Sequence, residues 1–209
     1  MALTFDDGAS VYTPQILSAL ARFHVRATFF DTGLADSRYP QYARAVVAAG
    51  DELGNHTYDH PKNWGYQAYY SWYSQRLELT RTTAVQKPLI GHAPCNMRPP
   101  GGAYDARSLA LVRSLGMSLV MWTTSGEDWE QPPYLSAAFQ QSIIRNVEAG
   151  ARLAHPIILL HAGKASHEPD CSPSGCTAGQ VSSFRGNTVA VLPTIIRFYL
   201  ARGYRFVVL

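Results

Sequence analysis

Short apolar runs alternate with helix-like segments along this 209-residue chain. The apolar runs have the length of buried strands, and the segments between them carry apolar residues at helical spacing. The predicted strands are Met1–Phe5, Ala27–Phe30, Glu52–Gly54, Ser118–Trp122, Pro156–Leu160 and Tyr204–Leu209. The predicted helices are Pro14–Phe23, Tyr42–Ala49, Trp64–Val85, Asp105–Leu115, Ser136–Ala149 and Thr188–Ala201. This alternation produces parallel strands covered by helices, so we expect an α/β fold.

The composition excludes several classes of protein. Hydrophobic residues make up 46% and charged residues 16% of the chain, which are globular values, and no run of about eighteen apolar residues is present to cross a bilayer. We therefore expect a single domain over residues 1–209. The net charge of +3 is carried by scattered lysines and arginines, so nothing points to a nucleic acid, whereas a neutral or anionic polymer fits as a partner.

The start of the chain and its cysteines bear on the cellular compartment. A strand begins at Met1 with no charged leader before it, which suggests a catalytic domain excised from a longer precursor. Of the three cysteines, Cys171 and Cys176 form the only local pair, and a disulfide there would indicate an oxidising compartment. Cys95 is predicted to be a buried small hydrophobic residue.

Two short segments carry metal-binding chemistry. Thr4-Phe5-Asp6-Asp7-Gly8 ends a strand with two carboxylates, and His56-Thr57-Tyr58-Asp59-His60 spaces two imidazoles by four, as on one face of a helical turn. Divalent ions such as zinc bind imidazole nitrogen and carboxylate oxygen, and catalytic sites use three protein ligands. Asp7, His56 and His60 are thus candidate ligands, and Asp6 remains as a base. Singly, each segment has a plain alternative as a turn or a packed histidine pair.

Further polar residues follow other predicted strands. Arg98 lies in a proline-rich loop, Asp128 and Trp129 follow the strand ending at Trp122, and His161 follows Leu160. In parallel barrels, side chains at the carboxyl ends of the strands meet at one mouth. We therefore expect these residues to meet Asp6, Asp7 and the histidines.

Five motifs in order resemble the polysaccharide deacetylases of carbohydrate esterase family four. They are Thr4-Phe5-Asp6-Asp7-Gly8, His56-Thr57-Tyr58-Asp59-His60, Arg98-Pro99-Pro100-Gly101-Gly102, Ser125-Gly126-Glu127-Asp128-Trp129 and Leu159-Leu160-His161. The resemblance implies a distorted parallel (β/α) barrel of about seven strands. It also implies a metal-dependent hydrolase that removes acetyl groups from N-acetylated sugar polymers, chitin-like or peptidoglycan-derived.

The resemblance assigns roles to the motif residues. Asp7, His56 and His60 would hold zinc (Zn2+), or else cobalt, nickel or manganese. Asp6 would be the base, Arg98 would orient it, His161 would be the acid, and the backbone N–H near Gly101 would stabilise the oxyanion. Leu159 and Trp129 would form the pocket for the acetyl methyl group.

Two positions depart from the family pattern. Ser125 stands where an aspartate usually supports the acid histidine, so Glu127, Asp128 or another carboxylate must support His161 if it is supported at all. Gly101 stands where an aromatic residue is common, which should widen the groove beside the oxyanion donor.

Three alternatives remain at this point. An acetylxylan esterase would use the same site on O-acetyl groups, and a catalytically silent carbohydrate-binding domain would keep the barrel without turnover. A zinc protease is disfavoured because no glutamate follows His56.

The aromatic stretch Trp64–Tyr73 could stack on sugars or pack on the core, and the segment 162–187 is either functional or a surface insertion. We expect a secreted or cell-wall-associated monomer.

Overall fold

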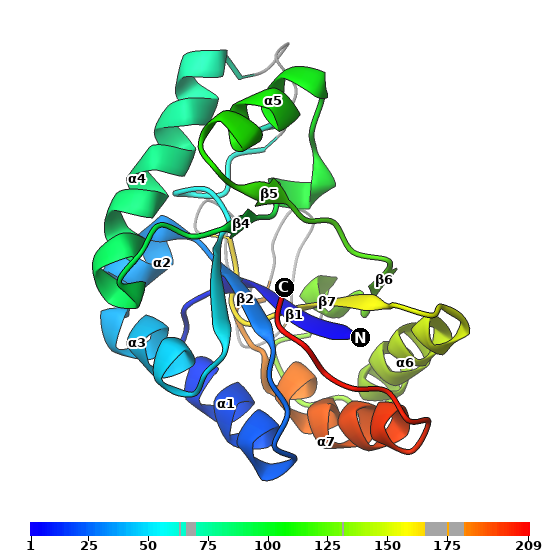
Figure 1. The fold of residues 1–209 in the computed structure, drawn as a ribbon. Coiled ribbons are helices and arrows are strands. Elements are labelled where there is room, and N and C mark those ends of the chain that lie inside the picture. The colour runs from blue at the N-terminus through cyan, green and yellow to red at the C-terminus, as the bar shows by residue number, and fades with distance from the viewer. Residues whose placement is uncertain (63, 66–69, 131, 166–174, 176–181) are drawn as a thin grey trace.

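The fold is a curled sheet of seven parallel strands surrounded by helices (Figure 1). The computed structural model describes residues 1–62, 64–65, 70–130, 132–165, 175 and 182–209. The strands are β1 (Ala2–Gly8), β2 (Thr28–Asp31), β3 (Glu52–Asn55), β4 (Asn96–Met97), β5 (Ser118–Leu119), β6 (Thr124–Ser125) and β7 (Ile157–His161). In the described part of the chain their order is β5-β4-β3-β2-β1-β7-β6, so β1 is an interior strand between β2 and β7, and β5 and β6 are the edges of a distorted barrel. The expected α/β barrel is confirmed.

Helices follow the strands and cover the outside of the sheet (Figure 1). They are α1 (Thr13–Arg22), α2 (Gly33–Arg38), α3 (Pro40–Ala48), α4 (Trp72–Ile90), α5 (Ala106–Ser114), α6 (Ala137–Glu148) and α7 (Gly186–Leu200). Short 3-10 helices occupy Pro100–Gly102 (η1), Asp128–Glu130 (η2) and Ala149–Arg152 (η3). None of the helices in the described ranges is long and apolar enough to cross a membrane.

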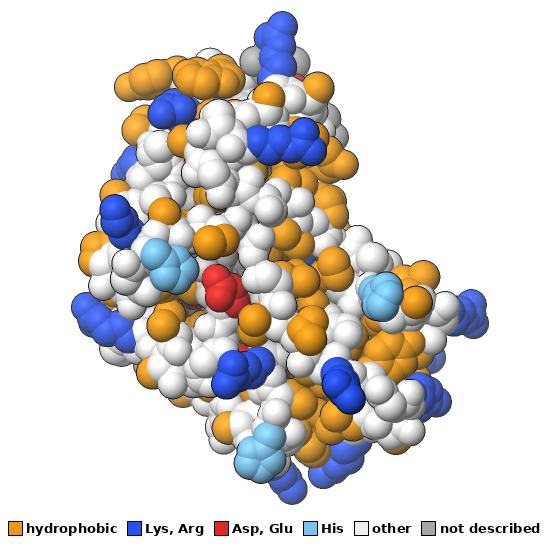
Figure 2. Space-filling model, in the orientation of Figure 1, with side chains coloured by type: hydrophobic (Ala, Val, Ile, Leu, Met, Phe, Trp, Pro, Cys, Tyr) orange, Lys and Arg blue, Asp and Glu red, His pale blue; other side chains and the backbone are white. Residues whose placement is uncertain are grey.

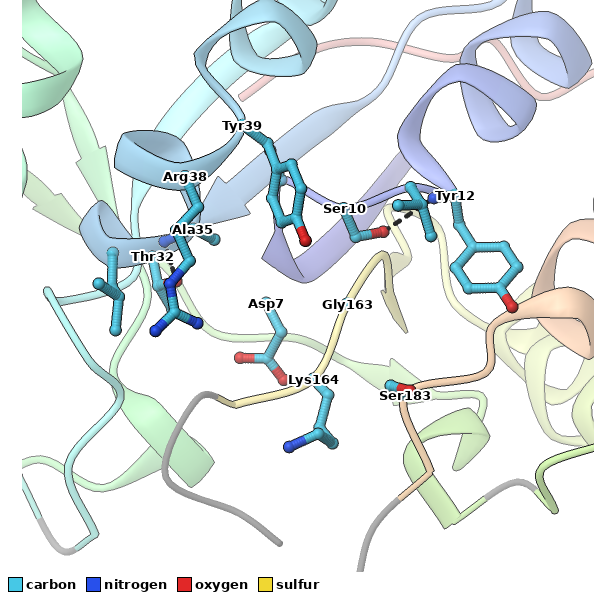
Figure 3. Close-up of a pocket in the computed structure, with 13 residues that line it drawn as sticks. Asp7, Ser10, Tyr12, Thr32, Ala35, Arg38, Tyr39, Gly163, Lys164 and Ser183 are labelled. Atoms are coloured by element: carbon cyan, nitrogen blue, oxygen red, sulfur yellow. Dashed lines mark hydrogen bonds between the residues drawn. The ribbon is translucent and has the colours of Figure 1, made fainter. Parts of the chain in front are cut away.

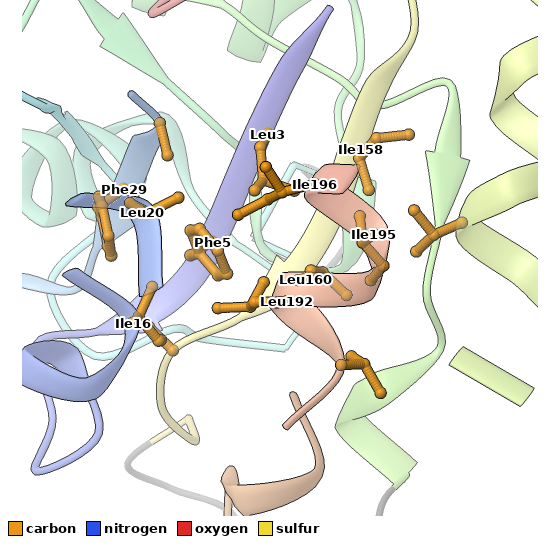
Figure 4. Close-up of a cluster of buried hydrophobic side chains, with 14 of the residues drawn as sticks. Leu3, Phe5, Ile16, Leu20, Phe29, Ile158, Leu160, Leu192, Ile195 and Ile196 are labelled. Carbon is orange, nitrogen blue, oxygen red and sulfur yellow. The ribbon is translucent and has the colours of Figure 1, made fainter. Parts of the chain in front are cut away.

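The main core lies between the central strands and the outer helices, because side chains alternate across a strand. Leu3 and Phe5 of β1 point outward into this core (Figure 4). They pack with three further side chains, and all five are fully buried: Ile158 and Leu160 of β7 and Leu192 of α7. A second cluster around Trp64 and Met97 lies between α4 and α5. The β1 side chains that alternate with Leu3 and Phe5 face the interior of the barrel.

Arg98 occupies that interior. Its side chain is fully buried, its Nη1 donates to Thr4 Oγ1 at 2.7 Å and its Nε donates to the carbonyl of Val120 at 3.3 Å. The guanidinium also stacks 4.3 Å over the ring of Phe30. A polar network therefore fills the inside of the barrel and connects β1 with the loop after β4.

Three local predictions are wrong. The expected helix from Trp64 begins only at Trp72, because Ser71 Oγ accepts the N–H of Ser74 and caps α4 there. The expected closing strand Tyr204–Leu209 forms no strand; the N–H of Val207 instead bonds to the carbonyl of Met1 at 3.0 Å, across the amino ends of the strands. Cys95 is exposed rather than buried.

Charge is scattered as expected on the face where both termini lie. Figure 2 shows its Lys and Arg side chains scattered over the face and its outline. The proposed pair Cys171–Cys176 lies outside the described residues. Among the described aromatic residues of this stretch, Trp64 is fully buried, Tyr70 packs against the same core cluster, and Tyr73 is 70% exposed.

Candidate active site

A bulge at the carboxyl end of β1 turns both acidic residues toward the same place. Asp6 pairs with Phe30 of β2 and Gly8 pairs with Asp31, so Asp7 is an extra residue in the ladder. Its φ of 62° is left-handed, a conformation that aspartate tolerates. Bulges redirect side chains. Two neighbouring carboxylates that would alternate across a regular strand can thus serve one site.

The two histidines lie on a loop after β3, not on the predicted helical turn. Thr57 and His60 have positive φ values of 65° and 59°, which a helix excludes. Glu78 of α4 holds the loop, because its Oε2 accepts the N–H of Tyr58 at 2.9 Å and that of Asp59 at 3.1 Å. The loop geometry nevertheless places the imidazoles of His56 and His60 with ring centroids 4.9 Å apart.

Asp7, His56 and His60 fit a divalent cation. Their ligand atoms lie within 4.8 Å of one another, and Asp7 Oδ1 is 3.6 Å from His56 Nε2 and 3.7 Å from His60 Nε2. Asp7 Oδ1 is buried and has no hydrogen-bond partner among the described residues, as expected for an atom that coordinates an ion. His56 Nδ1 lies 2.7 Å from the carbonyl of Arg98, which fixes the tautomer that leaves Nε2 able to coordinate.

The charges around this cluster suit coordination. Burial would raise the pKa of Asp7, but the nearby His60, His56, His161 and Arg185 outweigh it and hold that pKa below its usual value. Burial lowers the pKa of His56, and neutral imidazole is the form that binds metal. The residues therefore present an ionised carboxylate beside a neutral imidazole.

Asp6 is fixed by the buried arginine. Its Oδ1 accepts from Arg98 Nη1 at 2.8 Å, and its Oδ2 lies 3.7 Å from His56 Nε2. The carboxylate is 3% exposed. One oxygen is thus engaged by Arg98, and the other is directed toward the candidate metal ligands.

His161 ends β7 and is supported by Asp128, which resolves the absence of an aspartate at Ser125. His161 Nδ1 lies 2.8 Å from Asp128 Oδ1, and Asp128 Oδ2 accepts both the N–H of His161 at 3.0 Å and Thr188 Oγ1 at 2.6 Å. Burial alone would lower the pKa of His161, but the charge and hydrogen bond of Asp128 raise it above its ordinary value. Burial would raise the pKa of Asp128, yet the charge of His161 holds it low.

One cavity of about 330 Å³ collects most of the predicted residues. It is lined by Asp6, Asp7, His56, His60, Gly101, Trp122, Ser125, Glu127, Trp129, Leu159, His161 and Arg185. Arg98 and Asp128 do not line it and lie behind Asp6 and His161. Arg98 contacts Asp6 Oδ1, and Asp128 contacts His161 Nδ1.

Three lining residues were given no place in the cavity by the sequence, although Glu127 belongs to the fourth motif. Trp122 lies beside Gly102, and the guanidinium carbon of Arg98 is 5.7 Å from the centroid of its ring. Glu127 Oε2 accepts the indole N–H of Trp129 at 3.2 Å and so orients that ring. Arg185 is 1% exposed, and its Nε donates to the carbonyl of Gly163 at 2.6 Å. The predicted strand ends at Trp122 and the fourth motif contains Glu127, whereas Arg185 precedes a helix without any pattern.

Known proteins are similar to this chain in sequence and in fold. A family model described as polysaccharide deacetylase matches residues 1–120. A chitooligosaccharide deacetylase of Sinorhizobium fredii is 32% identical over 203 residues, which cover 97% of this chain and 86% of that protein. A peptidoglycan-N-acetylglucosamine deacetylase of Bacillus cereus is 29% identical over 210 residues, covering 100% of this chain and 66% of that protein.

A solved structure agrees with these relatives. It is a peptidoglycan N-acetylglucosamine deacetylase in complex with 4-naphthalen-1-yl-N-oxidanyl-benzamide, and it superposes with a TM-score of 0.81 at 29% identity, covering 100% of this chain and 85% of that one. The region matched by the family model is more than half of the chain and contains the first three motifs. The chain therefore belongs to the polysaccharide deacetylase family of hydrolases.

Proposed function

We propose that residues 1–209 form one catalytic domain that hydrolyses the acetamide of N-acetylglucosamine units in chitooligosaccharides or peptidoglycan. The observation that carries the proposal is that Asp6, His161 and the candidate metal ligands all line one cavity. The names of the two relatives supply the substrate class. Zinc is the first expectation for the cation because two imidazoles and one carboxylate are a catalytic zinc set, and cobalt, nickel or manganese accept the same ligands.

The attack on the acetyl carbon needs an activated water. A divalent cation bound by Asp7, His56 and His60 would polarise the acetyl carbonyl and lower the pKa of a water molecule. Asp6 is the proposed base for that water. The hydrogen bond from Arg98 fixes its Oδ1 and leaves Oδ2 for the proton. The backbone N–H of Gly101 is the proposed donor to the oxyanion, a charge that develops only as the carbonyl is attacked.

Departure of the amine is the task proposed for His161. An amine anion is too basic to leave, so the nitrogen must receive a proton as its bond to carbon breaks. Asp128 occupies Nδ1 of His161, which leaves Nε2 for the substrate. The raised pKa of His161 keeps more of the ring protonated near neutral pH, which is the state that an acid requires.

The acetyl methyl group is assigned to the apolar side of the cavity. Leu159 is 5% exposed on β7, and the ring of Trp129 is fixed by Glu127. We further propose that the chain acts as a monomer outside the cell or at the cell wall, where the substrate of the Bacillus cereus relative is found, and that it binds no nucleic acid.

Acetate release tests the proposal. The protein is assayed on chitooligosaccharides, peptidoglycan and acetylxylan, before and after treatment with a chelator. We expect chelator-sensitive release from the N-acetylated glycans and slower release from acetylxylan. Faster release from acetylxylan would favour the esterase alternative. Retention of oligosaccharide without any acetate would identify a silent binding domain and contradict the proposal.

A further inference from the structure

The guanidinium of Arg185 is a buried cation in the active site that the proposed reaction steps do not use. It lines the active-site cavity but is almost fully buried. Its Nε donates to the carbonyl of Gly163 at 2.6 Å, and its Nη1 donates to the carbonyls of Ser182 at 2.7 Å and Phe184 at 3.0 Å. The rigid fork of a guanidinium holds such hydrogen bonds in fixed directions. Arg185 is therefore a rigid link between the segment after β7 and the segment before α7.

The segment after β7 lies against the backbone of the candidate metal ligand Asp7. A Cβ on Gly163 would overlap the carbonyl oxygen of Asp7, and the N–H of Ala162 donates to the carbonyl of Asp6 at 2.8 Å. Figure 3 shows Gly163 beside Asp7, where both residues line a neighbouring cavity of about 410 Å³. One end of the link formed by Arg185 is thus fixed against the end of β1.

The other end of the link is the first turn of α7. Arg185 is the residue before this helix, and its carbonyl accepts the N–H of Val189 at 3.0 Å. The same turn carries Thr188, which is fully buried and whose hydroxyl donates to Asp128 Oδ2 at 2.6 Å. Arg185 therefore ties this turn, together with the hydroxyl that contacts Asp128, to the segment after β7.

These contacts form a closed ring around the support of the proposed acid. Asp128 Oδ1 lies 2.8 Å from His161 Nδ1, and Gly163, which accepts from Arg185, follows His161 by two residues in the chain. Burial would raise the pKa of Asp128, but the charges of His161 and Arg185 outweigh it and hold that pKa low, so the carboxylate in the ring is ionised. The ring joins Arg185 to His161 through the segment after β7 and to Asp128 through α7.

We propose that Arg185 is a positioning residue for the protonation of the leaving amine. It holds the first turn of α7 where Thr188 fixes Asp128, and Asp128 in turn directs the ring of His161. The inference rests on the proposed function and adds a residue to its protonation step. An imidazole that is oriented by a carboxylate presents its other nitrogen in one direction, and proton transfer needs that nitrogen within hydrogen-bond reach of the leaving group.

The test uses two variants of Arg185 and one control. Arg185→Lys keeps the positive charge but loses the rigid fork, and Arg185→Gln loses both. Arg197→Gln changes an exposed arginine of α7 that lines neither cavity. Each protein is assayed on a chitooligosaccharide and on an O-acetylated oligosaccharide of the same length, and kcat and KM are determined for both. Zinc content and thermal melting are measured on the same preparations, so that loss of metal or of fold is detected directly.

We expect both Arg185 variants to lower kcat on the amide by about tenfold or more, while kcat on the ester stays within about threefold. The reason is that an alkoxide leaves without the proton that an amine requires. KM and zinc content should not change, and Arg197→Gln should match the wild-type protein on both substrates. Equal losses on amide and ester, an effect confined to KM, as a direct contact with the substrate would give, or no loss in either variant would overturn the proposal.

A double-mutant cycle tests the route of the effect. Thr188→Val removes only the hydroxyl that contacts Asp128, and it is measured alone and combined with Arg185→Lys. If Arg185 acts through Thr188, the double variant should have about the same kcat on the amide as the less active single variant. Losses that multiply would show two independent effects and contradict the proposal. If Arg185→Gln does not fold, Arg185→Lys and this cycle decide the question. Absence of acetate from both substrates with the wild-type protein would contradict the proposed function instead.

Discussion

His161 Nδ1 lies 2.8 Å from Oδ1 of Asp128, a carboxylate with no exposed surface. The contact comes from a residue three positions after Ser125, where the family usually has its supporting aspartate. Asp128 also accepts the N–H of His161 and the hydroxyl of Thr188, so its two oxygens are fixed from three directions. Support of the proposed acid therefore does not require a carboxylate at Ser125.

Asp128→Asn should lower the pKa of His161, because the charge that raises it is removed. Since the proposed acid works in its protonated form, the alkaline limb of the kcat/KM profile should move to lower pH. Activity at pH 8 should fall by roughly ten- to a hundredfold, within the usual contribution of a general acid. The measurement is acetate release from a chitooligosaccharide between pH 5 and 9.

Ser125→Asp is the matched variant for this pair. It restores the family's residue on the cavity wall, yet we expect a change below threefold because Asp128 already occupies Nδ1 of His161. An unchanged alkaline limb in Asp128→Asn, or full rescue of that variant by Ser125→Asp, would remove Asp128 from its positioning role.

His161→Ala should affect amides more than esters. An alkoxide leaves far more easily than an amine anion, so only the amide depends strongly on proton donation. We expect a loss of about 10³ on N-acetyl substrates and at least tenfold less on an O-acetyl substrate of the same length. Equal losses on the two substrates would contradict the assignment of His161 as the acid.

Asp6→Asn should separate catalysis from metal binding. The asparagine keeps a hydrogen-bond acceptor for Arg98 but cannot take a proton, so turnover should fall by roughly 10²–10⁴ while bound metal, measured by elemental analysis, stays at the wild-type level. His56→Ala should lose both metal and activity, whereas His92→Ala, an exposed histidine outside the cavity, should lose neither. A near-normal rate for Asp6→Asn would exclude Asp6 as the base.

A buried acid pair behind the site should make stability fall as the pH rises. Asp36 is fully buried beside Asp31, with Gln86 Nε2 donating to its Oδ2 at 2.9 Å, and burial raises its pKa to about 7. The folded state therefore holds a proton that the unfolded chain releases from about pH 4 upward, and the stability it provides is lost between about pH 4 and 7.

Asp36→Asn should remove much of this dependence, since a neutral amide replaces the acid. Urea unfolding at pH 5 and pH 8 measures it, and the gap between the two free energies of unfolding should narrow in the variant. Glu130→Gln, at an exposed position, is the control and should retain the wild-type gap. An unchanged gap in Asp36→Asn would show that Asp36 does not titrate in this range.

The parallel sheet and the positions of the motif residues could be predicted because both follow from local patterns. Asp6, Asp7 and His161 had to meet once their strands were parallel, since the carboxyl ends of such strands form one mouth. The conformation of the histidine loop could not be predicted, because Glu78 of α4, which is far from the loop in sequence, holds the N–H groups of Tyr58 and Asp59. Arg185 reached the cavity for similar reasons: a contact with Gly163 places it there, and no periodicity encodes such a contact.

The most direct test of the metal site is a zinc titration of chelator-treated protein, with bound metal and acetate release measured on the same samples. We expect no acetate release without metal. In the wild-type protein, bound metal and acetate release should rise in parallel and saturate at one equivalent of zinc, and neither should rise in His56→Ala. Acetate release from metal-free protein, or zinc binding that saturates at one equivalent in His56→Ala, would contradict a cation held by Asp7, His56 and His60.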